Sequence, residues 1–312
     1  MSDLVSQEQP TGPERGNLAV LVGMLLKDPF AVASVAVLVI LALFALIGPF
    51  LLNDAAVSMN LRMRNLAPFN LDNGWVYYLG ADSLGRSMLA RIVVGARTTF
   101  TIALCAVSMS MVVGGTLGVI AGYAGGWTST LILRLADVIF SFPSLLLAMI
   151  ILYIVGPSIF NVIAILAFGG LPLYIRVTRS EVLELRQRTY VNAARAIGAR
   201  PRRILVRHIV PLVLPTVITL GALHFSGAVL AESGLSFLGL GVQPPDFTWG
   251  AMVSTGRNYL QTAWWLAFFP GLAIIVTTLS LNILANWGRT VADPQQRWRL
   301  QLSRPGRRRL PK

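Results

Sequence analysis

Few side chains in this sequence could carry out covalent or metal chemistry. The lone cysteine, Cys105, cannot form an internal disulfide or a cysteine-based metal site. The two histidines, His208 and His224, are sixteen positions apart, which matches no zinc-binding spacing. The only lysines are Lys27 and Lys312, so a phosphate-binding loop of the G-x-x-x-x-G-K-[ST] type cannot exist. The residue types therefore predict no catalytic site, no metal and no cofactor bound by this chain.

The composition indicates an integral membrane protein. Of the 312 residues, 55% are hydrophobic and only 12% are charged, about half the charged share of a soluble domain. The mean hydropathy is +0.67. These values exclude an ordinary soluble enzyme, a disordered chain and a disulfide-stapled secreted domain.

Long stretches without a charged residue predict an all-α fold with six membrane-spanning helices. A helix needs about 20 predominantly apolar residues to cross the hydrocarbon core. Two stretches are divided at glycine-containing turns, residues 122–126 and 156–158, although a single kinked helix stays open at the second. The expected spans are residues 29–52, 98–121, 137–156, 158–175, 209–231 and 264–288, which form a transmembrane domain at 29–288.

Basic residues predict the orientation of these spans. Residues 176–208 carry nine arginines against two glutamates, and residues 289–312 carry seven arginines and a lysine against one aspartate. Six spans put both segments on one side, and the positive-inside rule makes that side cytoplasmic. The segment 1–28 joins them there, with an interfacial helix near 18–26 and without the basic start of a secretory signal. The basic tail 289–312 is expected to meet anionic lipid, and no nucleic-acid-binding motif accompanies the charge.

Ionisable residues beside or inside the spans are candidates for the path or its gate. Arg134 and Asp137 are three apart on one helical face, so they either pair locally or take a direct part in transport. Glu232 stands where the fifth span should emerge, which favours an interface carboxylate over a buried proton relay. His224 lies mid-span, either packed and hydrogen-bonded or lining a pore.

The loop between the fourth and fifth spans predicts a short helix on the membrane surface. Thr189 is a suitable N-cap, Gly198 suits a left-handed C-terminal cap, and Pro201 fits the first turn of the next helix. Ala193, Ala194 and Gly198 would let a partner approach the backbone closely. A solvated basic loop is the alternative that the residues leave open.

The segment from Tyr190 to Pro215 resembles the EAA loop of ABC-importer permease subunits. In that loop an E-A-A triplet is followed by a glycine and then by H-x-x-P, and the matching positions here are Ala193, Ala194, Gly198, His208 and Pro211. Asn192 replaces the glutamate of the triplet, which removes one charge from the short helix. His208 is expected to be structural, at the beginning of the fifth span.

Further segments resemble the dipeptide/oligopeptide permeases of the C type. They are Leu79–Arg86 with its continuation to Arg97, the stretch from Gly125 to Pro143, residues 232–245 with Trp249 and Gly250, and residues 265–294. These matches follow one another in the family's order. One departure is the lack of an acidic residue after Asn282.

The resemblance implies one membrane subunit of a bacterial ATP-driven importer for peptides. A second permease chain would complete the path, two ATPase subunits carrying ATP and Mg²⁺ would receive the helix at 190–198, and an extracytoplasmic binding protein would deliver the peptide. The bacterial cell membrane is the expected location. Nickel or glutathione as cargo, and a self-sufficient channel or membrane enzyme, are the alternatives.

Overall fold

The computed structural model describes residues 23–292, and every regular element in that part of the chain is a helix apart from one isolated bridge between Ala81 and Ser87. The all-α prediction is confirmed. The helices are α2 (Pro29–Val57), α3 (Met88–Ala124), α4 (Gly126–Phe140), α5 (Ser144–Val155), α6 (Ile159–Leu185), α7 (Thr189–Ala196), α8 (Pro201–Ile204), α9 (Val210–Phe237), α10 (Trp249–Gly256) and α11 (Trp265–Ala292).

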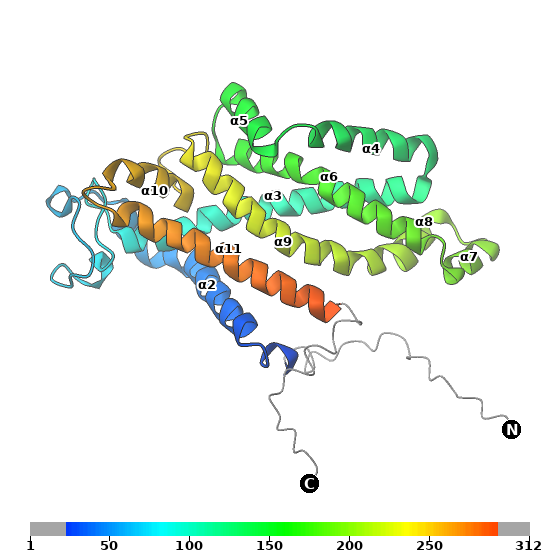
Figure 1. Ribbon diagram of the computed structural model, residues 1–312, viewed down its shortest axis with the longest axis horizontal. Coiled ribbons are helices and arrows are strands. Elements are labelled where there is room, and N and C mark those ends of the chain that lie inside the picture. Colours follow the sequence, from blue (N-terminus) through cyan, green and yellow to red (C-terminus); the bar gives the residue numbers. More distant parts are fainter. Residues whose placement is uncertain (1–22, 293–312) are drawn as a thin grey trace, which may run out of the picture.

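The long helices form an elongated bundle, with α7 at one end and α10 together with the connection between α2 and α3 at the other (Figure 1). We call these the α7 end and the α10 end. The helix at α8 passes through a π-helical turn, Leu205–Ile209, directly into α9. The expected interfacial helix near 18–26 and the basic tail fall largely outside the described residues.

Five helices are long and apolar enough to cross a membrane, and α4 with α5 forms a sixth candidate span that is bent by 83°. The expected third span at 137–156 therefore contains a break between Phe140 and Ser144. Pro143 lacks an N–H group and disfavours helical geometry in the residue before it, so α4 ends at Phe140 and α5 begins at Ser144.

The other helices extend beyond the stretches that the sequence delimits. A search for charge-free residues stops at the first charge, whereas α3 begins at Met88 and includes Arg91 and Arg97. Likewise α6 continues past Arg176 to Leu185. The start of α2 does follow the expected boundary, because the Asp28 carboxylate accepts the N–H groups of Phe30 and Ala31 ahead of the apolar run.

The contact between α3 and α6 depends on a row of small residues. Ser110, Gly114, Gly118 and Gly122 recur at every fourth position of α3 and all are buried. A Cβ atom at Gly118 would lie only 2.7 Å from Cβ of Thr178, and one at Gly122 only 2.7 Å from Cβ of Val182. Small residues in such a row let two membrane helices meet backbone to backbone.

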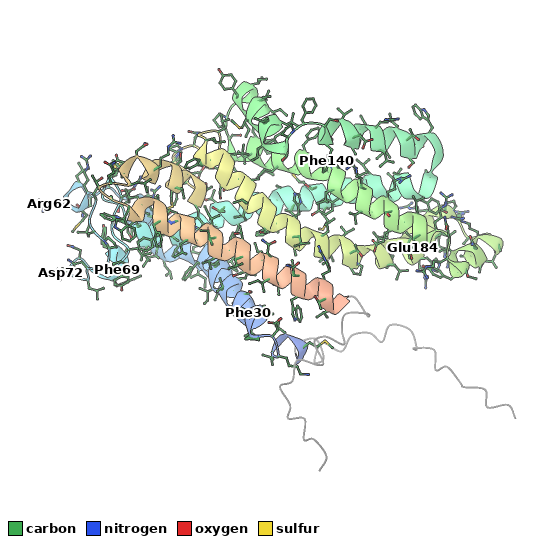
Figure 2. All side chains as sticks on the ribbon, in the orientation of Figure 1. Phe30, Arg62, Phe69, Asp72, Phe140 and Glu184 are labelled. Atoms are coloured by element: carbon green, nitrogen blue, oxygen red, sulfur yellow. The ribbon has the colours of Figure 1, made fainter. Side chains whose placement is uncertain are left out.

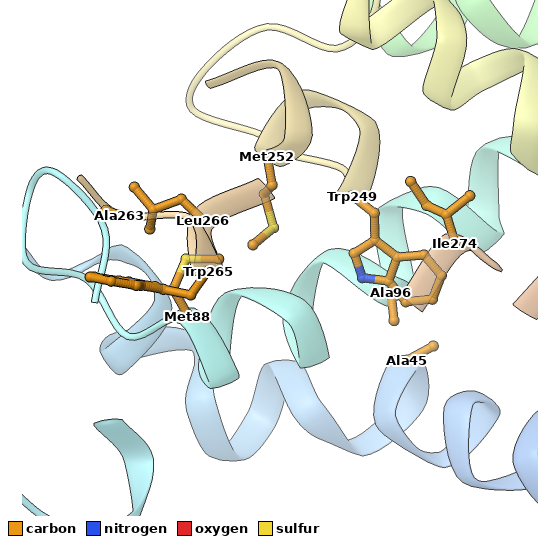
Figure 3. Close-up of a cluster of buried hydrophobic side chains, with 9 residues drawn as sticks. All are labelled: Ala45, Met88, Ala96, Trp249, Met252, Ala263, Trp265, Leu266 and Ile274. Carbon is orange, nitrogen blue, oxygen red and sulfur yellow. The ribbon is translucent and has the colours of Figure 1, made fainter. Parts of the chain in front are cut away.

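A second cluster joins α2, α3, α10 and α11 at the α10 end (Figure 3). Trp249 is fully buried there, and its Nε1 donates to the Ile92 carbonyl at 2.8 Å. Trp265 Nε1 donates to the Ala81 carbonyl at 3.2 Å. Gly80 has a φ of +82° beside that indole, where a side chain would be strained and crowded. Two tryptophans thus fasten the connecting segments to the bundle.

We predict that Gly118→Ala destabilises the protein by about 1–3 kcal/mol, because the added methyl group overpacks the α3–α6 contact. Gly115→Ala, three positions earlier, is the matched control: its Cβ would enter open space, and it should be neutral or slightly stabilising. Unfolding midpoints of the purified variants in one detergent measure the difference. Equal stability of the two variants would show that the glycine row is not a tight contact.

Candidate functional site

The helix α7 stands at the end of the bundle between α6 and α8. It begins at Thr189 with Arg188 as N-cap, so the expectation that Thr189 caps the helix is wrong by one residue. Its C-terminal end is a Schellman motif: the N–H of Gly198 donates to the Arg195 carbonyl, and the N–H of Ala199 donates to the Ala194 carbonyl. Gly198 has a φ of +80°, as its predicted role requires.

One face of α7 packs against the rest of the molecule. Val191 is fully buried and Ala194 is 9% exposed, and both belong to an apolar cluster with Ile204 and Ile209. The expectation that Ala194 is open to a partner is therefore wrong, because this residue faces inward at helical spacing from Val191. The short helix is held against α8 and the π-helical turn by side-chain packing.

The opposite face of α7 is open. Asn192, Ala193 and Gly198 are exposed, and Ile197 is 85% exposed at the tip. Asn192 Nδ2 donates to the Gln187 carbonyl at 3.3 Å, so this side chain makes a local contact. Ile197 is a candidate contact for a partner protein, and it was not among the residues predicted from the sequence. The signal for it was an apolar residue directly before the capping glycine of a surface helix.

The remaining predicted residues of this segment lie next to α7. The centroids of the Tyr190 and His208 rings are 6.5 Å apart, so His208 lies beside the short helix. His208 lies in the π-helical turn, and Pro211 is exposed in the first turn of α9. These contacts connect α7 to the beginning of α9.

Arginines tie the neighbouring helix ends together. Arg186 Nη1 donates to the Tyr123 carbonyl at 2.8 Å, which occupies a free carbonyl at the end of α3. Arg179 Nε donates to Ser129 Oγ in α4 at 2.8 Å. Glu184, labelled in Figure 2, pairs with Arg188 at 2.6 Å. Much of the charge at this end therefore fixes the place from which α7 projects.

Arg134 and Asp137 do not pair with each other. Asp137 pairs instead with Arg176 of α6 at 2.7 Å, and the Arg176 guanidinium lies over the Phe140 ring. Within residues 23–292, Arg134 is exposed and makes no ion pair. The local pair that the i, i+3 spacing favours gives way because α6 brings a second cation alongside α4.

His224 takes the packed arrangement. Its Nδ1 lies 3.3 Å from the hydroxyl of the fully buried Tyr174, and the two rings meet edge to face. Its Cε1 occupies the space beside Gly170 where any side chain would stand. The ring also borders a cavity of about 220 Å³ between α5, α6 and α9.

Glu232 is fully buried, so the expectation of an interface carboxylate is wrong. Ser236 Oγ donates to its Oε1 at 2.6 Å, and Thr248 Oγ1 lies 3.3 Å from that serine hydroxyl. Thr248 is also the N-cap of α10. The helix α9 runs past Glu232 to Phe237, and α10 folds back over it, which seals the carboxyl group inside.

The segment from Leu79 to Arg86 forms a tight turn ahead of α3. The Asp82 carboxylate accepts the N–H groups of Leu84 and Arg86 at 2.9 Å each, and Arg86 Nε at 2.7 Å. Gly85 has a φ of +75° and presses against the Asn60 backbone, where a side chain would collide. Arg62 and Asp72, labelled in Figure 2, lie at this same end, opposite α7.

Comparison with known proteins agrees with this arrangement. Residues 114–298 match the family described as the binding-protein-dependent transport system inner membrane component, and residues 22–68 match the N-terminal TM domain of oligopeptide transport permease C. The chain belongs to this family of ABC-importer permeases, in its dipeptide/oligopeptide branch. It is a multi-pass membrane protein and a transport subunit rather than an enzyme.

Individual relatives cover most of the chain. A probable D,D-dipeptide transport system permease protein of Escherichia coli is 34% identical over 295 residues, which cover 95% of this chain and 97% of the relative. A di/tripeptide permease protein of Pseudomonas aeruginosa is 39% identical, covering 70% of this chain and 72% of its own. A glutathione permease protein of Pectobacterium atrosepticum is 38% identical, covering 70% and 73%.

We predict that Glu232→Ala destabilises this permease by about 1–3 kcal/mol, because the buried Ser236 hydroxyl loses its acceptor. Glu232→Gln keeps a carbonyl acceptor and should cost less. Glu184→Ala, at a carboxylate that is 67% exposed, should cost under about 1 kcal/mol. Unfolding midpoints in detergent compare the three variants, and a Gln variant as unstable as the Ala variant would contradict the role of the hydrogen bond.

Proposed function

We propose that this permease forms half of the membrane path of an ATP-driven importer of di- and oligopeptides, and that α7 couples the path to ATPase subunits. The proposal of a peptide cargo is based on the relatives, two of which are named for a dipeptide and for di/tripeptides. The third carries the name of glutathione, which is itself a short peptide.

The observation that carries the coupling role is the two-faced character of α7. Val191 and Ala194 fasten one face to the bundle, while Ile197, the C-cap residue of α7, is 85% exposed. An exposed apolar side chain on a small helix is a suitable anchor for a groove in another protein. The residues proposed to contact the ATPase are Tyr190, Asn192, Ala193, Ile197 and Gly198. Ala194, His208 and Pro211 would support this surface from the side of the π-helical turn and α9.

Movement of α7 would reach the membrane through α9. The chain runs from α7 through residues 197–200 into α8, and α8 continues without a break through the π-helical turn into α9. Ile204 and Ile209 pack in the same cluster as Val191. Closure of two ATP- and Mg²⁺-loaded ATPase subunits would pull α7 and tilt α9, opening the path to one side. Such a shift requires that the partners bind the two states with different affinity.

The α7 end would face the cytoplasm, together with both chain termini. This orientation is supported by the excess of arginine in residues 176–208. The α10 end would then face outward, where an extracytoplasmic peptide-binding protein could reach residues 58–87 and 238–264. A second permease chain would close the other half of the path, and lipid would cover the apolar faces that remain.

Of the four residues proposed for the path or its gate, His224 borders a cavity of about 220 Å³. Arg134 and Asp137 lie on the exposed side of α4, where Asp137 joins α4 to α6. Glu232 supports α10 from inside. We therefore propose a contact with cargo for His224 and positioning roles for Asp137 and Glu232.

Purification of the tagged chain from its host in mild detergent tests the architecture. We expect a second permease chain and P-loop ATPases to co-purify. ATP-dependent uptake of labelled dipeptides by vesicles containing the complex and its binding protein then tests the cargo, with glutathione and Ni²⁺ as competitors. Stronger uptake of glutathione or Ni²⁺ than of dipeptide would assign that solute as the cargo instead. Solute flux through the isolated chain without ATP would favour a channel.

We predict that Ile197→Ser lowers peptide uptake by about tenfold, because it removes the apolar anchor of α7. The side chain is exposed, so the amount of folded protein in the membrane should not change. Ile197→Leu is the matched control, since it keeps the apolar volume and should retain most uptake. Normal uptake by the Ser variant would contradict docking through this residue.

A further inference from the structure

At the α10 end, Arg91 is a buried cation with few partners. Arg91 is 8% exposed, and its Nη1 donates one long hydrogen bond to the Ala56 carbonyl at 3.3 Å. Its Nε stands 3.8 Å from the Asp82 carboxylate, beyond hydrogen-bonding distance. One flat side of the guanidinium is covered by the Phe247 ring, 4.1 Å from the ring centroid.

The nearest carboxylate cannot satisfy both arginines of this site. Asp82 already accepts two backbone N–H groups and Arg86 Nε. A guanidinium has five N–H donors, and among the described residues no hydrogen bond uses Nη2 of Arg91 or either Nη atom of Arg86. Two guanidinium groups thus share one largely occupied anion.

The two arginines that carry the unused donors line open space. Arg86 and Arg91 both line a polar cavity of about 220 Å³, which is walled by the loop before α10 and by α10 itself. Both also line an adjoining small space of about 30 Å³. Gln243 and Asp246 stand at the exposed rim of the larger cavity.

We propose that Arg86 and Arg91 bind the C-terminal carboxylate of the transported peptide in this cavity. A planar guanidinium matches a carboxylate with paired hydrogen bonds, and a partly buried setting strengthens them. Asp246 on the same lining disfavours a multiply charged anion and suits a zwitterion, whose amino group it can attract. The inference rests on the proposed function, because it assigns the peptide's carboxylate to a site on the permease.

The test compares uptake of a labelled dipeptide with uptake of its C-terminal amide by the complete importer in vesicles. Wild-type and variant complexes receive the same binding protein, so any change in the acid-to-amide ratio arises in the permease. Arg91→Gln should lower this ratio by about tenfold, the effect expected for a lost hydrogen bond to a charged group. Arg86→Gln, at a more exposed side chain, should lower it in the same direction.

Arg257→Gln is the matched control. Arg257 is exposed, lies over the Phe237 ring and lines neither space, so its loss should leave the ratio unchanged. Equal loss of acid and amide uptake in the Arg91 and Arg86 variants would overturn the proposal in favour of a structural role or of docking by the binding protein. Uptake of both peptides at the wild-type level in these variants would also overturn it. If the wild-type importer takes up neither peptide, the proposed function itself has failed.

Discussion

The backbone-to-backbone contact of α3 with α6 determines where the rest of the molecule can lie. Gly114, Gly118 and Gly122 place no α3 side chain between the helices, so the α3 backbone packs directly against carbonyl oxygens and Cβ atoms of α6, and the separation cannot easily change. The helix α6 leads directly into α7, and Arg186 fastens the end of α6 to the last carbonyl groups of α3. The position of α7 thus follows from a contact made in the interior of the membrane domain.

The helix α9 connects the two ends of the molecule. At the α7 end it continues the π-helical turn that packs beneath α7, and at the α10 end it carries Glu232, whose hydrogen bonds lead through Ser236 to the cap of α10. Its middle meets Tyr174 through His224. The helix α9 therefore links the packing beneath α7 with the cap of α10 through one continuous element.

The sequence allowed the membrane class, the apolar helices and the short helix with its glycine cap to be predicted, because composition and capping act locally. It did not reveal the bend at Pro143 between α4 and α5, since the apolar run continues across it. The ion pair of Asp137 with Arg176 joins residues 39 apart in the chain, and the burial of Glu232 depends on α10 folding back. The side on which Ala194 and Ile197 fall depends on packing as well. Each of these is a tertiary effect that spacing along one helix cannot specify.

The Schellman motif of α7 has a consequence for the speed and strength of association. All of its hydrogen bonds are made by the backbone of α7 and the next three residues, so the conformation of the helix does not depend on another protein. A surface that receives such a preorganised element does not have to order a loop, and the conformational entropy usually lost at an interface was already lost during folding. An encounter of α7 with a partner protein would then be a rigid-body one, in which orientation rather than refolding limits the rate.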